Sequence, residues 1–132
     1  MAKPVNRVYP IRLQPVSNGV YFIGIGGIGM SALARYFLSE GPPRLGEAGW
    51  KVSGSDISPS SITAELKKEG VTVYTGKQSA NNVRKSGAML VIYNNAIQKE
   101  NPEMLAAEKM GAAVRSYPEM IGELTKKYKT IA

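Results

Sequence analysis

Hydrophobic positions follow two different periods along this chain, and the first change of period comes early. Residues Val20–Ile23 form a short apolar run with the β-branched and aromatic bias of a buried strand. From Met30 onward, apolar residues recur at i, i+3, i+4, i+7 and i+8, which predicts an amphipathic helix over Ile28–Glu40. The stretch between the strand and the helix is rich in glycine.

Strand and helix patterns keep alternating to the end of the chain. Further strands are predicted over Trp50–Asp56, Val71–Tyr74, Ala88–Tyr93 and Ala112–Arg115, and Lys129–Ala132 begins to look like another. Further helices are predicted from the Ser58-Pro59 cap to Gly70, from the Asn101 cap to Met110 and over Tyr117–Lys127, with at best a short helix in Ser79–Ser86. Alternating strands and helices imply parallel pairing with right-handed crossovers. The sequence therefore predicts an α/β fold, a doubly wound, Rossmann-like parallel sheet of about five strands with helices on both faces.

Two stretches do not fit this alternation. Residues 1–19 contain prolines without a sustained period, and we expect a loosely ordered N-terminal arm there, followed by one domain over residues 20–132. Residues Pro42–Gly49 form a loop longer than most connections between a helix and the next strand.

Composition limits the chemistry available to the chain. The 132 residues include neither cysteine nor histidine, which excludes disulfides, thiolate zinc sites, cysteine nucleophiles and catalytic triads. The acids Glu103, Glu119 and Glu123 are interpreted as helix-surface residues or as partners of helix dipoles in first turns. We expect no catalytic residue and no metal-ligating residue in this chain.

The formal charge of +7 raises the possibility of a nucleic-acid-binding protein. The lysines and arginines are dispersed, however, and their small clusters at Lys67–Lys68 and Lys126–Lys127 fall where helices are predicted to end. We therefore expect no nucleic-acid partner. The sequence has neither an apolar run of about 20 residues nor the apolar core of a signal peptide, so we expect no membrane association and a cytoplasmic location.

The glycines after the first strand have the spacing G-x-G-x-x-G at Gly24, Gly26 and Gly29. In such a turn the first glycine permits the sharp bend, the second lets the backbone approach a phosphate, and the third lets the helix pack closely on the strand. The start of the following helix offers unpaired N–H groups and the positive end of its dipole. This context favours a nucleotide or another phosphate ligand; the alternative is a tight turn that binds nothing.

In a doubly wound sheet, ligands bind at the carboxyl ends of the strands, where the strand order reverses. That rule brings the glycine turn together with Asp56 and with Asn94–Asn95. Asp56 could accept hydrogen bonds from a ribose or a base, or it could cap a turn. The two asparagines could present amides to phosphate or sugar, or could simply form a turn, and Ser31 could donate to a phosphate or cap its own helix.

Several motifs occur together in a familiar order: G-I-G-G-I-G-M-S-A-L-A (Gly24–Ala34), V-S-G-S-D (Val52–Asp56), N-N-A-I (Asn94–Ile97), N-P-E (Asn101–Glu103) and R-S-Y-P-E-M-I (Arg115–Ile121). Together they resemble the N-terminal domain of the Mur ligase family, in particular of the members that join L-alanine to UDP-N-acetylmuramate in peptidoglycan synthesis. The resemblance extends over Val20–Ala132, and the double-glycine form of the first motif is much more specific than G-x-G-x-x-G alone.

The resemblance implies a three-domain parent enzyme. Its N-terminal domain would bind the UDP part of UDP-N-acetylmuramate, and its central domain would hold ATP and Mg²⁺ on a P-loop. The muramic acid carboxylate would become an acyl phosphate, which the amine of L-alanine attacks. No cofactor is implied for the N-terminal domain itself; its partners would be UDP-N-acetylmuramate and the ATP-binding domain.

Carried onto this sequence, the resemblance makes residues 26–31 the cradle of the pyrophosphate, places Asp56 and Ile57 by the uridine, and closes residues 94–96 over the phosphates. The full set of candidate substrate-binding residues is Gly24, Ile25, Gly26, Gly27, Ile28, Gly29, Met30, Ser31, Asp56, Ile57, Asn94, Asn95 and Ala96.

The chain departs from the family pattern in two places. Pro42–Gly49 is an insertion, and the final K-T-I-A resembles the strand that leads to the family's phosphate loop, but the loop itself is absent. We therefore expect a UDP-binding domain cut from a larger ligase and inactive alone, because ligation needs the P-loop and its Mg²⁺. Two alternatives remain open: an NAD-binding Rossmann module, and the related ligase that recycles murein tripeptide.

Overall fold

A parallel five-stranded sheet forms the centre of the computed structural model, which describes residues 19–39 and 50–131. The strands are β1 (Gly19–Ile23), β2 (Lys51–Asp56), β3 (Thr72–Thr75), β4 (Leu90–Tyr93) and β5 (Ala113–Ser116). Their order in the sheet is β3-β2-β1-β4-β5, and every neighbouring pair is parallel. The predicted α/β fold with about five parallel strands is confirmed.

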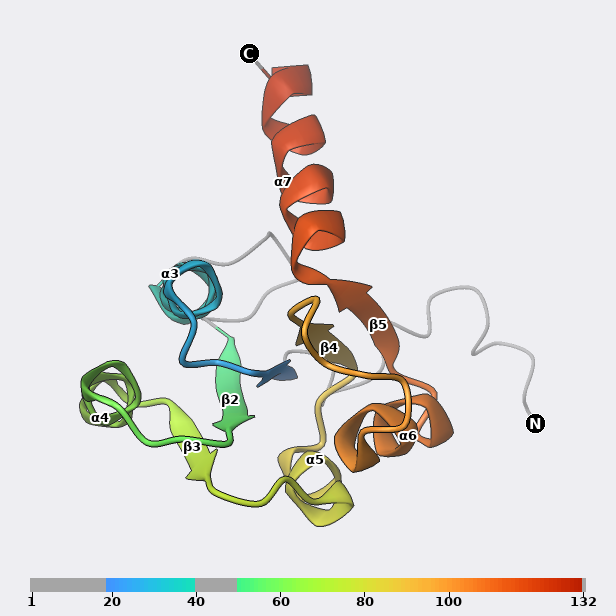
Figure 1. Cartoon of the computed structure of the whole chain (residues 1–132). Coiled ribbons are helices and arrows are strands. Elements are labelled where there is room, and N and C mark those ends of the chain that lie inside the picture. The colour runs from blue at the N-terminus through green and yellow to red at the C-terminus, as the bar shows by residue number, and fades with distance from the viewer. Residues whose placement is uncertain (1–18, 40–49, 132) are drawn as a thin grey trace, which may run out of the picture.

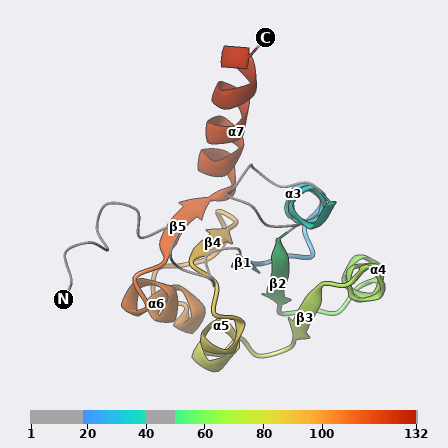
Figure 2. The same cartoon turned by 180° about the vertical axis from the view of Figure 1, so that it is seen from behind.

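Helices cover both faces of the sheet, as Figures 1 and 2 show from opposite sides. They are α3 (Ile28–Ser39), α4 (Ser61–Glu69), α5 (Ala80–Ser86), α6 (Pro102–Lys109) and α7 (Tyr117–Ile131). Two separate apolar clusters define the faces: α3, α4 and α7 contribute to one, and α5 and α6 contribute to the other. This division is the doubly wound arrangement.

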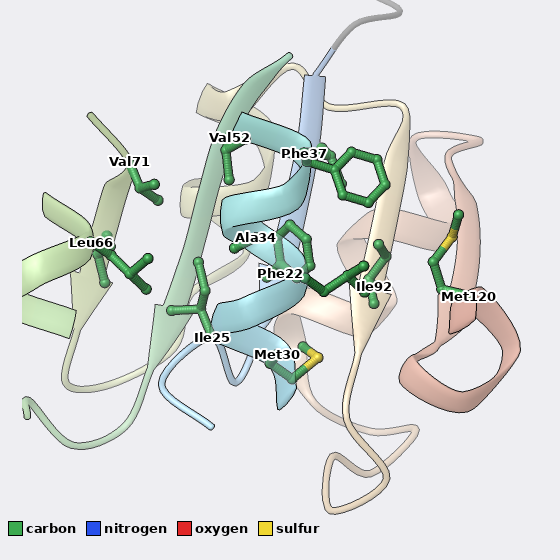
Figure 3. Close-up of a cluster of buried hydrophobic side chains, with 13 residues drawn as sticks. Phe22, Ile25, Met30, Ala34, Phe37, Val52, Leu66, Val71, Ile92 and Met120 are labelled. Atoms are coloured by element: carbon green, nitrogen blue, oxygen red, sulfur yellow. The ribbon is translucent and has the colours of Figure 1, made fainter. Parts of the chain in front are cut away.

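Strand β1 explains how one segment supports both clusters. Its side chains alternate between the faces, so that Val20 and Phe22 join the cluster under α3 while Tyr21 and Ile23 join the cluster under α5 and α6. All four side chains are fully buried. In Figure 3, Phe22 lies beside Phe37 of α3, and their rings meet edge-on with centroids 5.9 Å apart. Burial of each such side chain contributes on the order of 1.5–3 kcal/mol.

The start of α4 differs from the sequence-based prediction. We expected Ser58 as the N-cap with Pro59 in the first turn, but the cap is Ser60. The Ser60 hydroxyl accepts the Thr63 N–H at 3.2 Å, and the Thr63 hydroxyl accepts the Ser60 N–H at 2.9 Å. This reciprocal pair satisfies two backbone donors at once, whereas the N–H of Ser58 is held by Asp56 in the preceding turn.

The end of the chain also differs. We expected Lys129–Ala132 to begin another strand, but α7 continues to Ile131. A helix satisfies its backbone hydrogen bonds within the segment, whereas a strand needs a neighbouring strand. Figure 1 shows α7 extending away from the sheet beyond β5. Three predicted segments lie outside the described residues: the N-terminal arm (all of it except Gly19), the Pro42–Gly49 loop and Ala132.

The strand order reverses between β1 and β4, which lie side by side although crossovers lead from β1 toward β2 and from β4 toward β5. The segments that follow β1 and β4 therefore leave the sheet on either side of this point. Binding crevices of doubly wound sheets form at such a position. The glycine turn follows β1, and Asn94 follows β4.

Candidate functional site

The glycine turn is fixed by hydrogen bonds to the end of β2. The Ser55 carbonyl accepts both the Gly24 N–H at 2.9 Å and the Ile25 N–H at 2.8 Å. Gly24 has φ of 89°, a left-handed conformation that favours glycine. A Cβ on Gly24 would also lie 2.6 Å from the Nδ2 of Asn94. The turn after β1 and the segment after β4 are thus in direct contact.

Gly26 faces a carboxylate of the protein itself. Its N–H donates to Oδ2 of Asp56 at 2.8 Å, and a Cβ on Gly26 would lie 2.7 Å from the same oxygen. The other oxygen of Asp56 accepts the Ser58 N–H at 3.2 Å. The absence of a side chain at Gly26 therefore admits Asp56, where the sequence had suggested the approach of a phosphate. Asp56 also caps the following turn, which was the alternative interpretation of this residue.

The first turn of α3 presents three backbone donors without an internal acceptor. The N–H groups of Ile28, Gly29 and Met30 have no hydrogen-bond acceptor among residues 19–39 and 50–131, whereas the Ser31 N–H donates to the Gly27 carbonyl at 2.8 Å. The first turn of α3 contains no acidic residue. Unpaired N–H groups and the positive end of the helix dipole make such a turn suitable for an anion.

Two candidate side chains, those of Ser31 and Asn94, form local hydrogen bonds within their own segments, as in the second alternative that the sequence left open for each. Ser31 is almost fully buried, and its hydroxyl donates to the Ile28 carbonyl at 3.0 Å, as in a self-capped helix start. The Oδ1 of Asn94 accepts the Ala96 N–H at 2.9 Å, which closes a local turn. Both residues shape the backbone next to the glycine turn through these bonds.

The remaining candidates divide by exposure. The Ile25 and Met30 side chains lie in the core under α3, so only their backbones can face a ligand (Figure 3). Ile28 and Ile57 are instead 83% and 66% exposed, which is unusual for large apolar side chains. Asn95 and Ala96 are also exposed.

Gly29 makes room for a residue from the far end of the chain. A Cβ on Gly29 would lie 2.7 Å from the hydroxyl oxygen of Tyr117, at the start of α7. Gly29, Tyr117 and Leu124 also line part of an apolar groove of about 280 Å³ between α3 and α7. We expected Gly29 to let its helix pack closely on a strand. The space beside Gly29 is instead occupied by an aromatic side chain of another helix.

Glu103 was expected on a helix surface or as a dipole partner in a first turn, and the structure agrees with the second interpretation. Glu103 does lie in the first turn of α6, but it is fully buried. Its carboxylate accepts hydrogen bonds from the Ser55 hydroxyl at 2.6 Å, the Ser79 N–H at 3.0 Å and the Asn82 side-chain amide at 3.1 Å. The helical period offered a signal, because Glu103 precedes the buried Ala106 and Ala107 by three and four positions.

The Tyr21 hydroxyl lies next to this carboxylate. It is buried and has no hydrogen-bond partner in the described part of the chain. Burial raises the pKa of Tyr21 above its ordinary value, and the negative charge of Glu103 raises it further. The phenol is therefore held in its neutral form.

The described residues contain neither a membrane-spanning helix nor a cluster of metal-ligating side chains. No helix there combines the length and the apolar composition needed to cross a bilayer. Across residues 19–39 and 50–131, no group of three or more carboxylate, imidazole or thiol side chains is arranged to hold a metal ion.

Comparisons with known proteins identify the family of this chain and several of its relatives. Residues 19–129 match the model of the Mur ligase family, catalytic domain. Over 109 residues the chain is 42% identical to a UDP-N-acetylmuramate–L-alanine ligase of Acetivibrio thermocellus, covering 83% of this chain and 21% of that protein. A ligase of the same name from Campylobacter jejuni is 46% identical over 104 residues, covering 79% of this chain and 22% of the relative.

A solved structure has the same fold. The crystal structure of a UDP-N-acetylmuramate-alanine ligase from Thermotoga maritima aligns with a TM-score of 0.69 and 31% identity, covering 83% of this chain and 23% of that one. The chain thus spans about a fifth to a quarter of the length of the proteins that it matches.

Proposed function

Because this chain belongs to the Mur ligase family, we propose that it is the domain that binds the UDP part of UDP-N-acetylmuramate in an ATP-dependent ligase that adds L-alanine. The observation that carries the proposal is the set of three N–H groups, at Ile28, Gly29 and Met30, that have no acceptor in the described part of the chain and lie beside the point where the strand order reverses. The names of the relatives suggest the substrate, UDP-N-acetylmuramate, and the amino acid, L-alanine.

Each part of the crevice then has a role toward the ligand. The first turn of α3 binds the pyrophosphate through backbone donors. Asp56 keeps the turn in place through Gly26 and still has acceptor capacity for the ribose or the uracil, because a carboxylate can accept about four hydrogen bonds. The exposed Ile57 packs by the uridine, and residues 94–96 close over the phosphates.

ATP and Mg²⁺ belong to the central domain of the parent enzyme in this proposal. This domain contributes by holding UDP-N-acetylmuramate so that its muramic acid carboxylate reaches the phosphate donor, which is catalysis by positioning. The domain alone performs no ligation, and the enzyme acts in the cytoplasm.

The test is a titration of the ¹⁵N-labelled chain with UDP, uridine and NAD in parallel. With UDP we expect the amide resonances of Ile28, Gly29 and Met30 to shift most. Uridine lacks the phosphates and should leave these amides nearly unchanged. A response to NAD alone would favour the NAD-binding alternative and refute the proposal.

A variant of Ile28 makes the test specific to one backbone donor. Ile28→Pro removes one free N–H at the first helical position, where proline is well tolerated. Loss of one charge-assisted hydrogen bond, worth about 1.5–3 kcal/mol, should weaken UDP binding about 10- to 100-fold. Ile28→Ala is the matched control, since it removes the same exposed side chain and keeps the N–H. Equal UDP affinities for the two variants would exclude this donor from the site.

The tripeptide-recycling ligase shares the fold and the UDP ligand, so binding to this domain does not separate the two activities. The names of the relatives favour addition of L-alanine. An assay of the parent enzyme separates the two activities: it receives UDP-N-acetylmuramate, ATP and Mg²⁺ together with either L-alanine or murein tripeptide. Product formation with the tripeptide but not with L-alanine would reverse the assignment.

A further inference from the structure

A buried carboxylate connects the far side of the sheet to the end of β2. Glu103 has no exposed surface, and each of its partners is a donor: the Ser55 hydroxyl, the Ser79 N–H and the Asn82 amide. A buried carboxylate is tolerated only when its oxygens are satisfied in this way. Glu103 therefore ties the start of α6 to β2 and to the start of α5.

Further bonds fix the direction of the link between Glu103 and Ser55. The Ser55 hydroxyl accepts a hydrogen bond from the Gln78 side chain at 3.1 Å, so its own proton is directed to Glu103. The Asn101 side-chain NH₂ donates to the Gln78 side-chain oxygen at 2.6 Å, and the Asn101 Oδ1 atom accepts the Glu103 N–H at 2.8 Å. The network thus closes on itself around Ser55.

Ser55 and its neighbour hold three consecutive donors of the glycine turn. The Ser55 carbonyl accepts the N–H groups of Gly24 and Ile25, and the Asp56 carboxylate accepts the N–H of Gly26. The turn has few side chains of its own to fix its shape, so these bonds determine where the first turn of α3 begins. A displacement of Ser55 would therefore be passed directly to the turn.

We propose that Glu103 is a positioning residue for the phosphate-binding turn: through Ser55 it fixes the backbone whose free N–H groups receive the ligand. The inference rests on the proposed function, because it concerns the same binding site. Glu103 does not touch the ligand in this scheme. Its effect is preorganisation of the site, so that little ordering remains to be done when the ligand binds.

The competing explanation is that Glu103 only stabilises the packing of α5 and α6, through Ser79 and Asn82. Glu103→Gln separates the two roles. The glutamine carbonyl can still accept from Ser79 and Asn82, while its NH₂ group can meet Ser55 only as a donor, so the Ser55 hydroxyl loses the carboxylate to which it donates. Ser55→Ala removes the same link from the other side and leaves Glu103 in place.

The experiment compares Glu103→Gln, Ser55→Ala and the double variant with the unmodified chain, by ¹⁵N spectra and by titration with UDP. In the ligand-free protein, both single variants should shift the amides of Gly24, Ile25 and Gly26 and speed their hydrogen exchange. Affinity for UDP should fall on the order of tenfold in each single variant and little further in the double variant, because both remove one link. Glu108→Gln is the matched control, since it makes the same change on the exposed side of α6.

The outcomes keep this inference apart from the proposed function. Unchanged Gly24–Gly26 amides in folded Glu103→Gln would overturn it, and so would additive losses of UDP affinity in the double variant. If the unmodified chain does not bind UDP, the proposed function fails, while the spectra of the ligand-free proteins still test the positioning role. If Glu103→Gln does not fold, Ser55→Ala carries the same test.

Discussion

Two adjacent glycines in the turn after β1, Gly26 and Gly27, should respond differently to alanine. A Cβ on Gly26 would lie 2.7 Å from the Asp56 Oδ2 atom, whereas a Cβ on Gly27 would have no neighbour closer than 3.9 Å. Neither residue has a positive φ, so alanine fits both backbones. The difference between the variants therefore isolates the contact with Asp56.

The expected cost of Gly26→Ala follows from that contact. The added methyl group displaces the carboxylate and breaks the 2.8 Å hydrogen bond from the Gly26 N–H. A hydrogen bond to a charged group is worth about 1.5–3 kcal/mol. Replacing glycine by alanine recovers about 0.4–1 kcal/mol by restricting the unfolded chain. The net loss of stability should be about 1–2 kcal/mol, while Gly27→Ala should stay within about 0.5 kcal/mol of the unmodified chain.

Urea unfolding of the ligand-free chain, followed by circular dichroism, measures both variants without reference to UDP. With a slope of about 1–3 kcal/mol per molar urea, Gly26→Ala should lower the midpoint by roughly 0.3–2 M. In an Asp56→Ala background the same substitution should cost close to nothing, because the clash is gone. Equal midpoints for Gly26→Ala and Gly27→Ala would show that the turn does not depend on Asp56.

Three further outcomes are expected from the buried aromatic side chains. Tyr21→Phe should leave the urea midpoint at neutral pH unchanged or raise it, because it removes a buried hydroxyl without a partner. The pKa of Tyr21 is raised in the folded state, whereas the tyrosine of the unfolded chain ionises at about pH 10. The free energy of unfolding should therefore fall above pH 10 by up to about 1.4 kcal/mol per pH unit. The urea midpoint of Tyr21→Phe should fall less steeply with pH than that of the unmodified chain, and parallel declines would contradict this. Phe37→Ala should lower the free energy of unfolding by about 3–5 kcal/mol and alter the fluorescence of Trp50, whose ring centroid lies 5.0 Å from that of Phe37. Leu105→Ala removes a half-exposed side chain and should change the urea midpoint little.

The sequence by itself determined the order of strands and helices, because each element depends on its own period, caps and turn residues. The apolar run of β1, the glycine turn and the stripe of α3 are adjacent in the chain, so local rules were sufficient. The same rules failed where two local solutions compete, as at Ser58 and Ser60, both of which can cap a helix. They also failed after Lys129, where a short apolar pattern did not distinguish strand from helix.

Only the tertiary structure decided what the residues of the candidate site contact. Gly26 faces Asp56, Gly29 faces Tyr117, and the partners of each pair are 30 or more positions apart in the sequence. The burial of Glu103 likewise depends on α5 and α6 folding onto the same face of the sheet. Periods and spacings describe neighbours along one element, whereas these contacts form between elements that only the closed sheet brings together. The sequence could therefore indicate which turn is suited to an anion, and the fold decided which of its N–H groups have no acceptor within residues 19–39 and 50–131.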